Sequence, residues 1–392
     1  MNRTDGGVNL LALRSHNTAL VLDLLRAAGP DGISRLELAE RTGLTPQAVS
    51  KITARLREEG LAAEAGQRAS TGGKPRTVLR LVPEAGHAVG VHLDRDELRA
   101  VLADLDGSVV GERRVPLDLG AGAESVLGVV VREVEGVVGE VLGGAQGIFG
   151  DAEDGLDEDG VAASLLGLLG RLGLLGVGVA LPGPLDHAHG VLHRLTGFPE
   201  WDGFPLRDVL AGRLGVPVVV DKDTNAAALG LAVGGERGSF AYLHLGTGLG
   251  AGLVIGGTVH RGARTGAGEF GHQVIQLDGP PCSCGSRGCV EALCLAAIER
   301  GDVREAARVL GEGVSNLVAL LDIDLVLLGG RTIEAAPEPF VRGVAAVLDA
   351  RARREGASDG AVPVRLAPGG ARGVAEGAAQ LLLAPVFGRA DG

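Results

Sequence analysis

One imidazole and three thiols stand close together in the second half of the chain, at His272, Cys282, Cys284 and Cys289. One histidine and three cysteines are a ligand set that closes a tetrahedral structural Zn²⁺ site, with all four positions filled by protein. The alternative is that the cysteines carry no metal. The spacing of the whole set favours a zinc site.

Two carboxylates, Glu269 and Glu291, lie on either side of this cluster. A loop that a metal holds in place can position flanking groups that bind a polyol. Carboxylates and imidazoles accept several hydroxyl hydrogen bonds, and charge-assisted bonds are the stronger kind. Both residues could instead be ordinary surface carboxylates, but their position beside the metal cluster favours a small-molecule site.

The N-terminal segment has the pattern of two helices, a turn, a third helix and a hairpin. A helical run covers residues 16–29, and a capping box from Ser34 to Glu37 opens a second helix. Thr45 can cap a third helix that begins at Pro46, a favoured place for proline. Two strand-like runs joined by a basic, glycine-rich tip follow, which is typical of a winged helix-turn-helix.

Such a unit places its third helix in the major groove, while its wing reaches phosphate or the minor groove. The expected contacts are the helix cap, the outward side chains of the third helix and the cations of the wing: Thr45, Gln47, Ser50, Lys51, Arg55, Lys74 and Arg76. The alternative is a small helical domain that binds protein. Charge favours DNA, because residues 1–82 carry a net charge of +4 and the remainder −16.

Length and composition set the class of protein. A chain of 392 residues should form two or three units with cores of their own. Four cysteines are too few for a disulfide scaffold, which favours a reducing cytoplasm and metal ligation. The N-terminus has no apolar signal-peptide core, and no apolar run reaches the ~18 residues of a membrane span. We therefore expect a cytoplasmic protein with no membrane partner.

From Gly86 onward, strands alternate with helices, which fits two α/β lobes with a cleft between them. An acidic, glycine-rich insertion interrupts the pattern at about residues 143–160, and we read its charge run as a solvated surface segment. The remaining expected elements are strands within 88–117, a helix over 123–142, a strand in 174–186, a strand and helix in 217–235, a hairpin in 240–262 and a strand in 324–330.

Several motifs resemble one family. The segment CSCGSRGCVE is highly specific, and AGEFGH, LGTGLGAG, LPGPLD and DTNAAALG support it. Over roughly His16 to Leu383 the chain resembles the ROK family (repressors, open reading frames and kinases), in its repressor branch. The resemblance implies an α/β fold: an N-terminal winged helix-turn-helix followed by an actin/hexokinase-like two-lobed ROK domain.

The resemblance also implies domain boundaries. The winged helix would cover residues 1–83 and the ROK domain 84–392. The first lobe would take about 84–205 together with a C-terminal helix at about 371–388. The second lobe would then take about 206–370.

Family roles fall on particular residues of this chain. The resemblance makes His272, Cys282, Cys284 and Cys289 the zinc ligands. It places Glu269, His272 and Glu291 at positions that contact sugar hydroxyls. Asp223 matches the general base of family kinases, although a lone aspartate there could simply cap the helix that follows.

Two departures from the family pattern matter. Family kinases carry a D-x-G-G-T phosphate loop, and the matching stretch here, His92–Asp96, has lost both glycines. Its backbone amides cannot close on phosphate, and two aspartates would repel ATP. A second phosphate loop, Gly246–Gly250, is intact, but one of the two phosphate loops alone does not hold ATP productively.

Lys222 stands where the family usually has a sugar-binding asparagine, and it could recruit an anionic ligand or pair with Asp223. Glu200, just before Trp201, stands at a position where members of the family often have glycine.

Together these features predict a sugar-responsive transcriptional repressor that binds operator DNA as a homodimer or homotetramer. The sugar or sugar derivative would bind Asp223, Glu269, His272, Glu291 and Lys222, with a structural Zn²⁺ and no enzymatic activity. Two alternatives stay open: an ATP-dependent sugar kinase with a regulatory head, and a DNA-binding regulator whose vestigial cleft is controlled by a protein partner.

Overall fold

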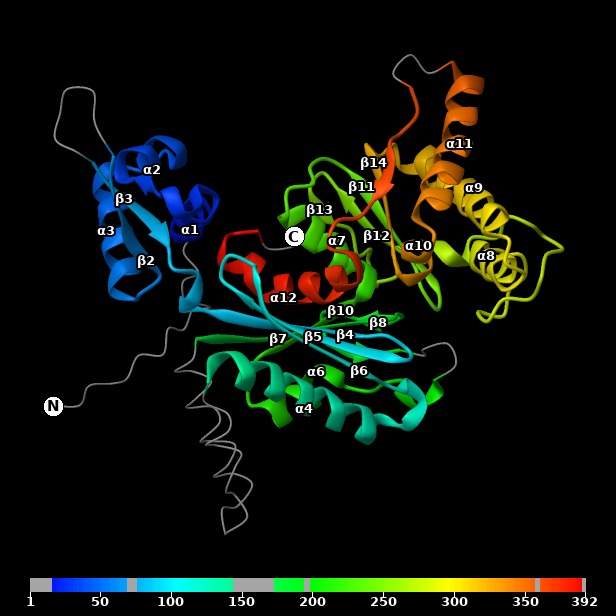
Figure 1. The fold of residues 1–392 in the computed structure, drawn as a ribbon, viewed down its shortest axis with the longest axis horizontal. Helices are drawn as coiled ribbons and strands as arrows, with labels where there is room; N and C mark the ends of the chain where they lie inside the picture. Colours follow the sequence, from blue (N-terminus) through cyan, green and yellow to red (C-terminus); the bar gives the residue numbers. More distant parts are fainter. Residues whose placement is uncertain (1–15, 69–75, 144–172, 194–197, 357–359, 390–392) are drawn as a thin grey trace, which may run out of the picture.

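A computed structural model describes residues 16–68, 76–143, 173–193, 198–356 and 360–389. Lys74, and the acidic insertion apart from Gly143, lie outside these residues. A winged helix stands at one end of the molecule and a larger two-lobed body at the other (Figure 1). No helix within the described ranges has both the length and the apolar character needed to cross a membrane.

The winged helix has the predicted order of elements. Its helices and strands are α1 (His16–Ala28), β1 (Ile33–Ser34), α2 (Arg35–Thr42), α3 (Pro46–Glu58), β2 (Ala62–Arg68) and β3 (Arg76–Leu81). Local sequence explains the helix starts, because the Ser34 hydroxyl accepts from the Glu37 amide at 3.3 Å and the Glu37 carboxylate accepts from the Ser34 amide at 2.9 Å. The Thr45 hydroxyl accepts from the Ala48 amide at 3.2 Å and begins α3.

The first lobe is built on a five-stranded sheet in the order β10-β7-β4-β5-β6. Helices α4 and α6 cover one face of this sheet, and α12 covers the other (Figure 1). The elements are β4 (His87–Leu93), β5 (Glu97–Asp104), β6 (Val109–Pro116), α4 (Ala123–Leu142), β7 (Leu174–Leu181), β8 (Leu185–Asp186), β9 (Val191–Leu192), α6 (Leu206–Leu214), β10 (Val218–Lys222) and α12 (Gly373–Val386).

The first sheet extends beyond the lobe boundary that the sequence suggested near residue 205. Strand β10 pairs in parallel with β7, with Lys222 opposite Leu181 at the end of the ladder. Helix α6 buries Leu206 and Leu210 in the same apolar core as α4. The first sheet therefore includes β10, which lies beyond the suggested boundary, because β10 pairs with β7 and not with a strand of the second sheet.

The second lobe has a sheet in the order β13-β12-β11-β14-β15. Helices α8, α9 and α11 share an apolar core with one face of it, and α7 shares a core with the other. The elements are α7 (Asp223–Val233), β11 (Phe240–Leu245), β12 (Leu249–Ile255), β13 (Thr258–Val259), α8 (Val290–Glu299), α9 (Val303–Leu321), β14 (Leu325–Gly329), α10 (Arg331–Ala335), α11 (Pro337–Glu355) and β15 (Val364–Leu366).

Helix α12 lies between the two sheets and packs against α7 (Figure 1). Small residues make this approach possible. A Cβ on Gly90 of the first sheet would lie 1.9 Å from the Ala375 carbonyl oxygen, and one on Gly377 would lie 2.0 Å from that of Ala226. Only glycine fits at these contacts, so α12 touches the backbone of both lobes directly.

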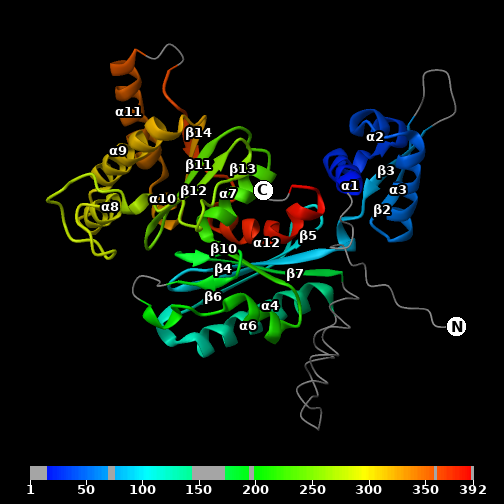
Figure 2. The ribbon, with the colours of Figure 1, turned by 180° about the vertical axis from the view of Figure 1, so that it is seen from behind.

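The winged helix docks on the C-terminal end of α12 (Figure 2). Leu22 and Leu25 of α1 join Leu383 and Phe387 in one buried cluster. The guanidinium of Arg26 lies 4.3 Å from the centre of the Phe387 ring. Helix α12 therefore contacts the first lobe, the second lobe and the winged helix.

Candidate functional site

The four predicted metal ligands converge at the start of α8. His272 ends a short 3-10 helix, Cys282 and Cys284 lie in the following loop, and Cys289 caps α8. Their ligand atoms all lie within 4.8 Å of one another. The His272 Nδ1 atom is 3.7 Å from Cys282 Sγ, and the sulfur atoms of Cys284 and Cys289 are 3.8 Å apart.

These distances fit a tetrahedral ion. A Zn–S bond of ~2.3 Å places two sulfur ligands of one zinc ~3.8 Å apart. The loop needs its glycine, because Gly288 has φ 66° and a Cβ there would lie 1.6 Å from the Gln276 carbonyl oxygen. Without an ion, burial raises the pKa of Cys289 to about 12, and a bound cation would instead favour its thiolate. The donor set therefore suits a metal such as zinc.

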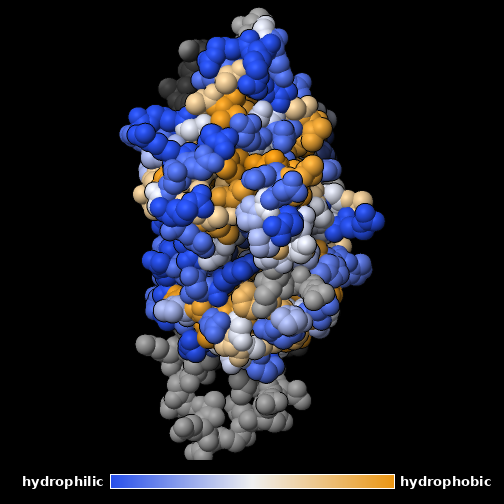
Figure 3. Space-filling model, turned by 90° about the vertical axis from the view of Figure 1, so that its right-hand side faces the viewer, coloured by the Kyte–Doolittle hydropathy of each residue, from blue (hydrophilic) through white to orange (hydrophobic). Residues whose placement is uncertain are grey.

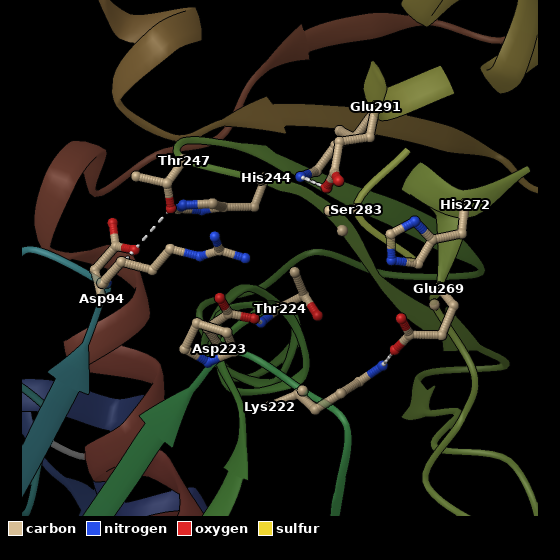
Figure 4. A pocket seen from close by; sticks show the side chains of 17 residues that line it. Asp94, Lys222, Asp223, Thr224, His244, Thr247, Glu269, His272, Ser283 and Glu291 are labelled. Carbon is tan, nitrogen blue, oxygen red and sulfur yellow. Dashed lines mark hydrogen bonds and ion pairs between the residues drawn. The ribbon is translucent and has the colours of Figure 1, made fainter. Parts of the chain in front are cut away.

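A cleft opens between the lobes beside this cluster (Figure 4). The first lobe contributes the β4–β5 turn, the loop after β7 and the end of β10. The second contributes the start of α7, the β11–β12 turn, the segment before the metal loop and the start of α8. The titratable side chains that line the cleft are Asp94, Arg95, Lys222, Asp223, His244, Glu269, His272 and Glu291.

All of the proposed sugar-binding residues line this one cleft. Glu291, in the first turn of α8, accepts a hydrogen bond from the Leu249 amide at 2.8 Å. Asp223 begins α7 and accepts from the amide of the next residue, Thr224, at 2.6 Å. The alternative that Asp223 simply caps this helix is not what the structure has, because the N-cap residue of α7 is Lys222 and no side chain makes the capping hydrogen bond, while Asp223 faces the cleft.

Lys222 is not an open anion site. Its side chain is only 3% exposed, and its Nζ atom donates to Glu269 Oε1 at 2.9 Å and to the Ala267 carbonyl oxygen at 2.5 Å. The alternative partner that the sequence suggested was Asp223, and the ion pair goes to Glu269 instead (Figure 4). The positive charge of Lys222 is therefore neutralised by a carboxylate of the candidate site itself.

The stretch that replaces the first phosphate loop makes protein contacts of its own. Arg331, at the start of α10, donates to Asp94 and Asp96. This hydrogen bonding lowers the pKa of Asp96. His92 is buried on β4, and burial lowers its pKa. Thr247 of the second phosphate loop donates to Asp94 Oδ1 at 3.2 Å.

Sequence reasoning missed several residues of this region, among them Arg331 and His244. Arg331 follows directly after the glycine pair that ends β14, and this position was the only available signal. His244 lines the cleft from β11, and its Nδ1 atom lies 3.0 Å from the Tyr242 hydroxyl. Glu200, which was noted as a departure, is exposed in the segment before Trp201 and does not line the cleft.

Four of the predicted DNA-binding residues share one face of α3. Gln47, Ser50, Lys51 and Arg55 are all exposed, and α3 lies on the side of the winged helix away from the body (Figures 1 and 2). Arg55 pairs with Glu59 at 3.0 Å. The wing residue Arg76 is exposed, and the hydroxyl of Thr45 is used in the cap of α3.

Comparison with known proteins agrees with this architecture. Residues 159–301 match the family model "ROK family", and residues 21–62 match "Winged helix-turn-helix DNA-binding". The chain is 30% identical over 325 residues to the N-acetylglucosamine repressor of Escherichia coli. This alignment covers 81% of this chain and 70% of the relative. It is 29% identical over 310 residues to the xylose repressor of Caldicellulosiruptor bescii, and this alignment covers 78% of this chain and 70% of the relative.

A solved structure shows the same fold over the full length. The crystal structure of a ROK family transcriptional regulator, a homologue of the E. coli MLC protein, aligns with a TM-score of 0.69 at 20% identity and covers 98% of both chains. The winged helix and the two-lobed body thus occur together in that protein. The chain belongs to the ROK family and carries a winged helix-turn-helix ahead of its ROK domain.

Proposed function

We propose that this protein is a DNA-binding transcriptional repressor whose effector is a sugar bound in the cleft between the lobes. The observation that carries the proposal is that one helix, α12, connects the winged helix to both lobes that line the cleft. Helix α12 contacts both lobes, and its end holds the winged helix through α1. Relatives named "N-acetylglucosamine repressor" and "Xylose repressor" support the same assignment.

The effector is a neutral sugar rather than an anionic derivative. Three carboxylates of the proposed sugar site, Asp223, Glu269 and Glu291, line the cleft together with Asp94. The cations that line it are Arg95 and Lys222, and the charge of Lys222 is already used by Glu269. A phosphate or carboxylate on the ligand would therefore meet more negative than positive charge. Hydroxyl groups suit this lining, since carboxylates accept strong hydrogen bonds from them.

The metal is Zn²⁺, and its role is to position the sugar site. Cys289 caps α8 two residues before Glu291, and His272 lies three residues after Glu269. A bound ion would fix both carboxylates through the chain. If Nδ1 of His272 binds the metal, its Nε2–H remains available as a hydrogen-bond donor to the ligand.

The cleft does not phosphorylate its ligand. Asp223 could accept a hydroxyl proton, but the first phosphate loop is replaced by Asp94 and Asp96, which bind Arg331. The runner-up function is an ATP-dependent sugar kinase with a regulatory head, favoured only by the intact Gly246–Gly250 loop. A cleft controlled by a protein partner is less favoured, because its three carboxylates still converge.

The effector acts through the relative position of the lobes. A ligand changes the DNA-bound fraction only if it binds two lobe arrangements with different affinity. Because α12 packs on both lobes, a change between them moves the surface on which α1 rests. The domain division follows: residues 1–83 bind operator DNA and 84–392 sense the sugar, with the lobe boundary near Lys222.

We also propose a homodimer that acts in the cytoplasm. The side of the body that carries α8 and α9 gathers apolar side chains on its surface (Figure 3). Leu277 in the metal loop is 86% exposed and Leu320 on α9 is 81% exposed. A twofold partner would cover them and place two winged helices on a palindromic operator.

The proposed function is tested with purified full-length protein and operator DNA. A panel of neutral sugars and their phosphate esters is screened by calorimetry, and each ligand is added to a mobility-shift assay. We expect one neutral sugar to bind and to change the DNA-bound fraction. Glu269→Gln keeps an oxygen acceptor for Lys222 but removes the carboxylate, so it should abolish the response and leave DNA binding without sugar unchanged.

Three results would redirect the assignment. ATP turnover with a sugar near ~1 per second, the low end for kinases, would favour the kinase. Binding of no sugar would favour the protein-controlled cleft. Equal sugar affinities of wild type and Glu269→Gln would place the effector elsewhere.

A further inference from the structure

The two lobes are tied together at the mouth of the cleft by one arginine. Arg331 of the second lobe donates from Nη1 to Asp96 Oδ2 at 2.7 Å and from Nη2 to Asp96 Oδ1 at 2.7 Å. Its Nη2 atom also donates to Asp94 Oδ2 at 2.8 Å. Both aspartates lie in the β4–β5 turn of the first lobe, so the guanidinium bridges the lobes with a fork that matches carboxylate geometry.

A second donor from the same side strengthens the contact. Thr247, in the turn between β11 and β12, donates to Asp94 Oδ1 at 3.2 Å. Thr332, next to the arginine, donates to the Gly246 carbonyl oxygen at 3.2 Å and ties α10 to that turn. The β4–β5 turn is therefore held by two neighbouring segments of the second lobe.

The charges explain why this contact is possible without a ligand. The two turns that face each other match the two phosphate loops of family kinases, which would meet across a bound anion. In this chain the negative charge is built into the first turn as Asp94 and Asp96, and the positive charge is supplied by Arg331. The first turn therefore binds Arg331, which lies beside the second turn, without any ligand between them.

We propose that Asp94, Asp96 and Arg331 form an intramolecular clamp that holds the lobes closed in the absence of any nucleotide and sets the affinity of the cleft for its effector. Asp94 also lines the cleft, so the clamp is continuous with the effector site. Asp96 is 57% exposed and Arg331 44% exposed, so salt screens the contact and the clamp can open. A sensor needs this reversibility, because an effector shifts the equilibrium between open and closed lobes by no more than its difference in affinity for the two states.

The clamp is tested in full-length protein without sugar, by small-angle X-ray scattering at low and high salt. Arg331→Gln should raise the radius of gyration at low salt to the value that wild type reaches only at high salt. Arg331→Lys keeps the positive charge but loses the two parallel hydrogen bonds of the guanidinium, so its radius of gyration at low salt should lie between those of wild type and Arg331→Gln. The matched control is Arg342→Gln, which removes an exposed arginine paired with Glu338 inside α11 and should behave as wild type.

A second measurement, sugar affinity, rests on the proposed sugar site. Arg331→Gln should weaken binding of the neutral sugar by about five- to tenfold, the lower part of the usual range for coupled equilibria. Asp96→Asn combined with Arg331→Gln should be no weaker than Arg331→Gln alone, since both remove the same contact.

The scattering result is independent of whether any sugar binds. The clamp is refuted if Arg331→Gln and wild type give superimposable profiles at low salt. It is also refuted if the effects of Asp96→Asn and Arg331→Gln on the radius of gyration add. Failure of every sugar to bind wild type, with an opened Arg331→Gln profile, would sink the proposed effector and keep the clamp.

Discussion

The Nζ atom of Lys222 lies 2.9 Å from Oε1 of Glu269, and this ion pair joins the last residue of β10 to the segment that leads into the metal loop. It uses one cation of the cleft to hold a carboxylate that we propose binds the sugar. The pair links the electrostatics of the site to its geometry, because Glu269 is 44% exposed and would otherwise be free to turn.

The first prediction concerns the charge of the ligand. Lys222→Met removes the cation and leaves the Glu269 carboxylate without its partner. We expect neutral-sugar affinity to fall about tenfold, or 1.4 kcal/mol, because Glu269 is no longer held toward the cleft. In wild type a sugar phosphate should bind more weakly than the parent sugar, and calorimetry measures both. Tighter binding of the phosphate ester to wild type would mean that Lys222 meets the ligand directly.

The second prediction concerns the metal. Cys284→Ser should lose the ion and lower the melting temperature, since metal binding and folding of the loop are coupled. Elemental analysis of the purified protein measures the zinc content, with about one ion per chain expected for wild type. Cys294→Ala is the matched control, because Cys294 is a buried cysteine of α8 outside the cluster. Wild-type protein that contains no zinc after purification without chelators would refute the site.

The third prediction concerns DNA. Lys51 is exposed on the outer face of α3. Lys51→Ala should weaken operator binding and lower the salt dependence of the affinity by about one charge if the residue meets a phosphate. Fluorescence anisotropy at several salt concentrations gives the slope. Arg353→Ala, an exposed arginine of α11 on the body, should leave both quantities unchanged. A truncated protein that lacks residues 1–82 but still binds the operator would contradict the domain assignment.

The fourth prediction concerns coupling between the body and the winged helix. The Arg389 side chain donates to Asp23 of α1 at 3.0 Å and 3.2 Å. We expect Arg389→Ala to leave sugar affinity unchanged and to reduce the effect of sugar on DNA binding, because one contact between the body and α1 is lost. An exposed pair contributes ~0.2–1 kcal/mol, so the reduction should be partial.

A double-mutant cycle with Asp23→Ala checks that this pair is responsible. The two single variants and the double variant should show the same reduced response in the mobility-shift assay. A full sugar response in Arg389→Ala would show that the signal reaches the winged helix by another contact.

The sequence by itself determined the features that short windows encode. The capping box at Ser34 and the Thr45 cap fix where α2 and α3 begin, because their hydrogen bonds span only three residues. The histidine and cysteines from 272 to 289 come together for the same reason, since one loop carries them all. The order of strand and helix patterns fitted an α/β body with two lobes, and the family motifs and the helix caps predicted the ROK fold and the winged helix.

The tertiary structure decided which distant residues meet. Lys222 and Glu269 are separated by 47 positions, Arg331 and Asp96 by 235, and Arg389 and Asp23 by 366. Such pairs depend on which strands become neighbours and where each helix crosses a sheet. For the same reason the sequence did not show that β10 belongs to the first sheet. A buried parallel strand is a continuous apolar run, and this pattern does not depend on which strand it pairs with. Residue types therefore predicted the chemistry of the cleft, and long-range packing decided how its charges are paired.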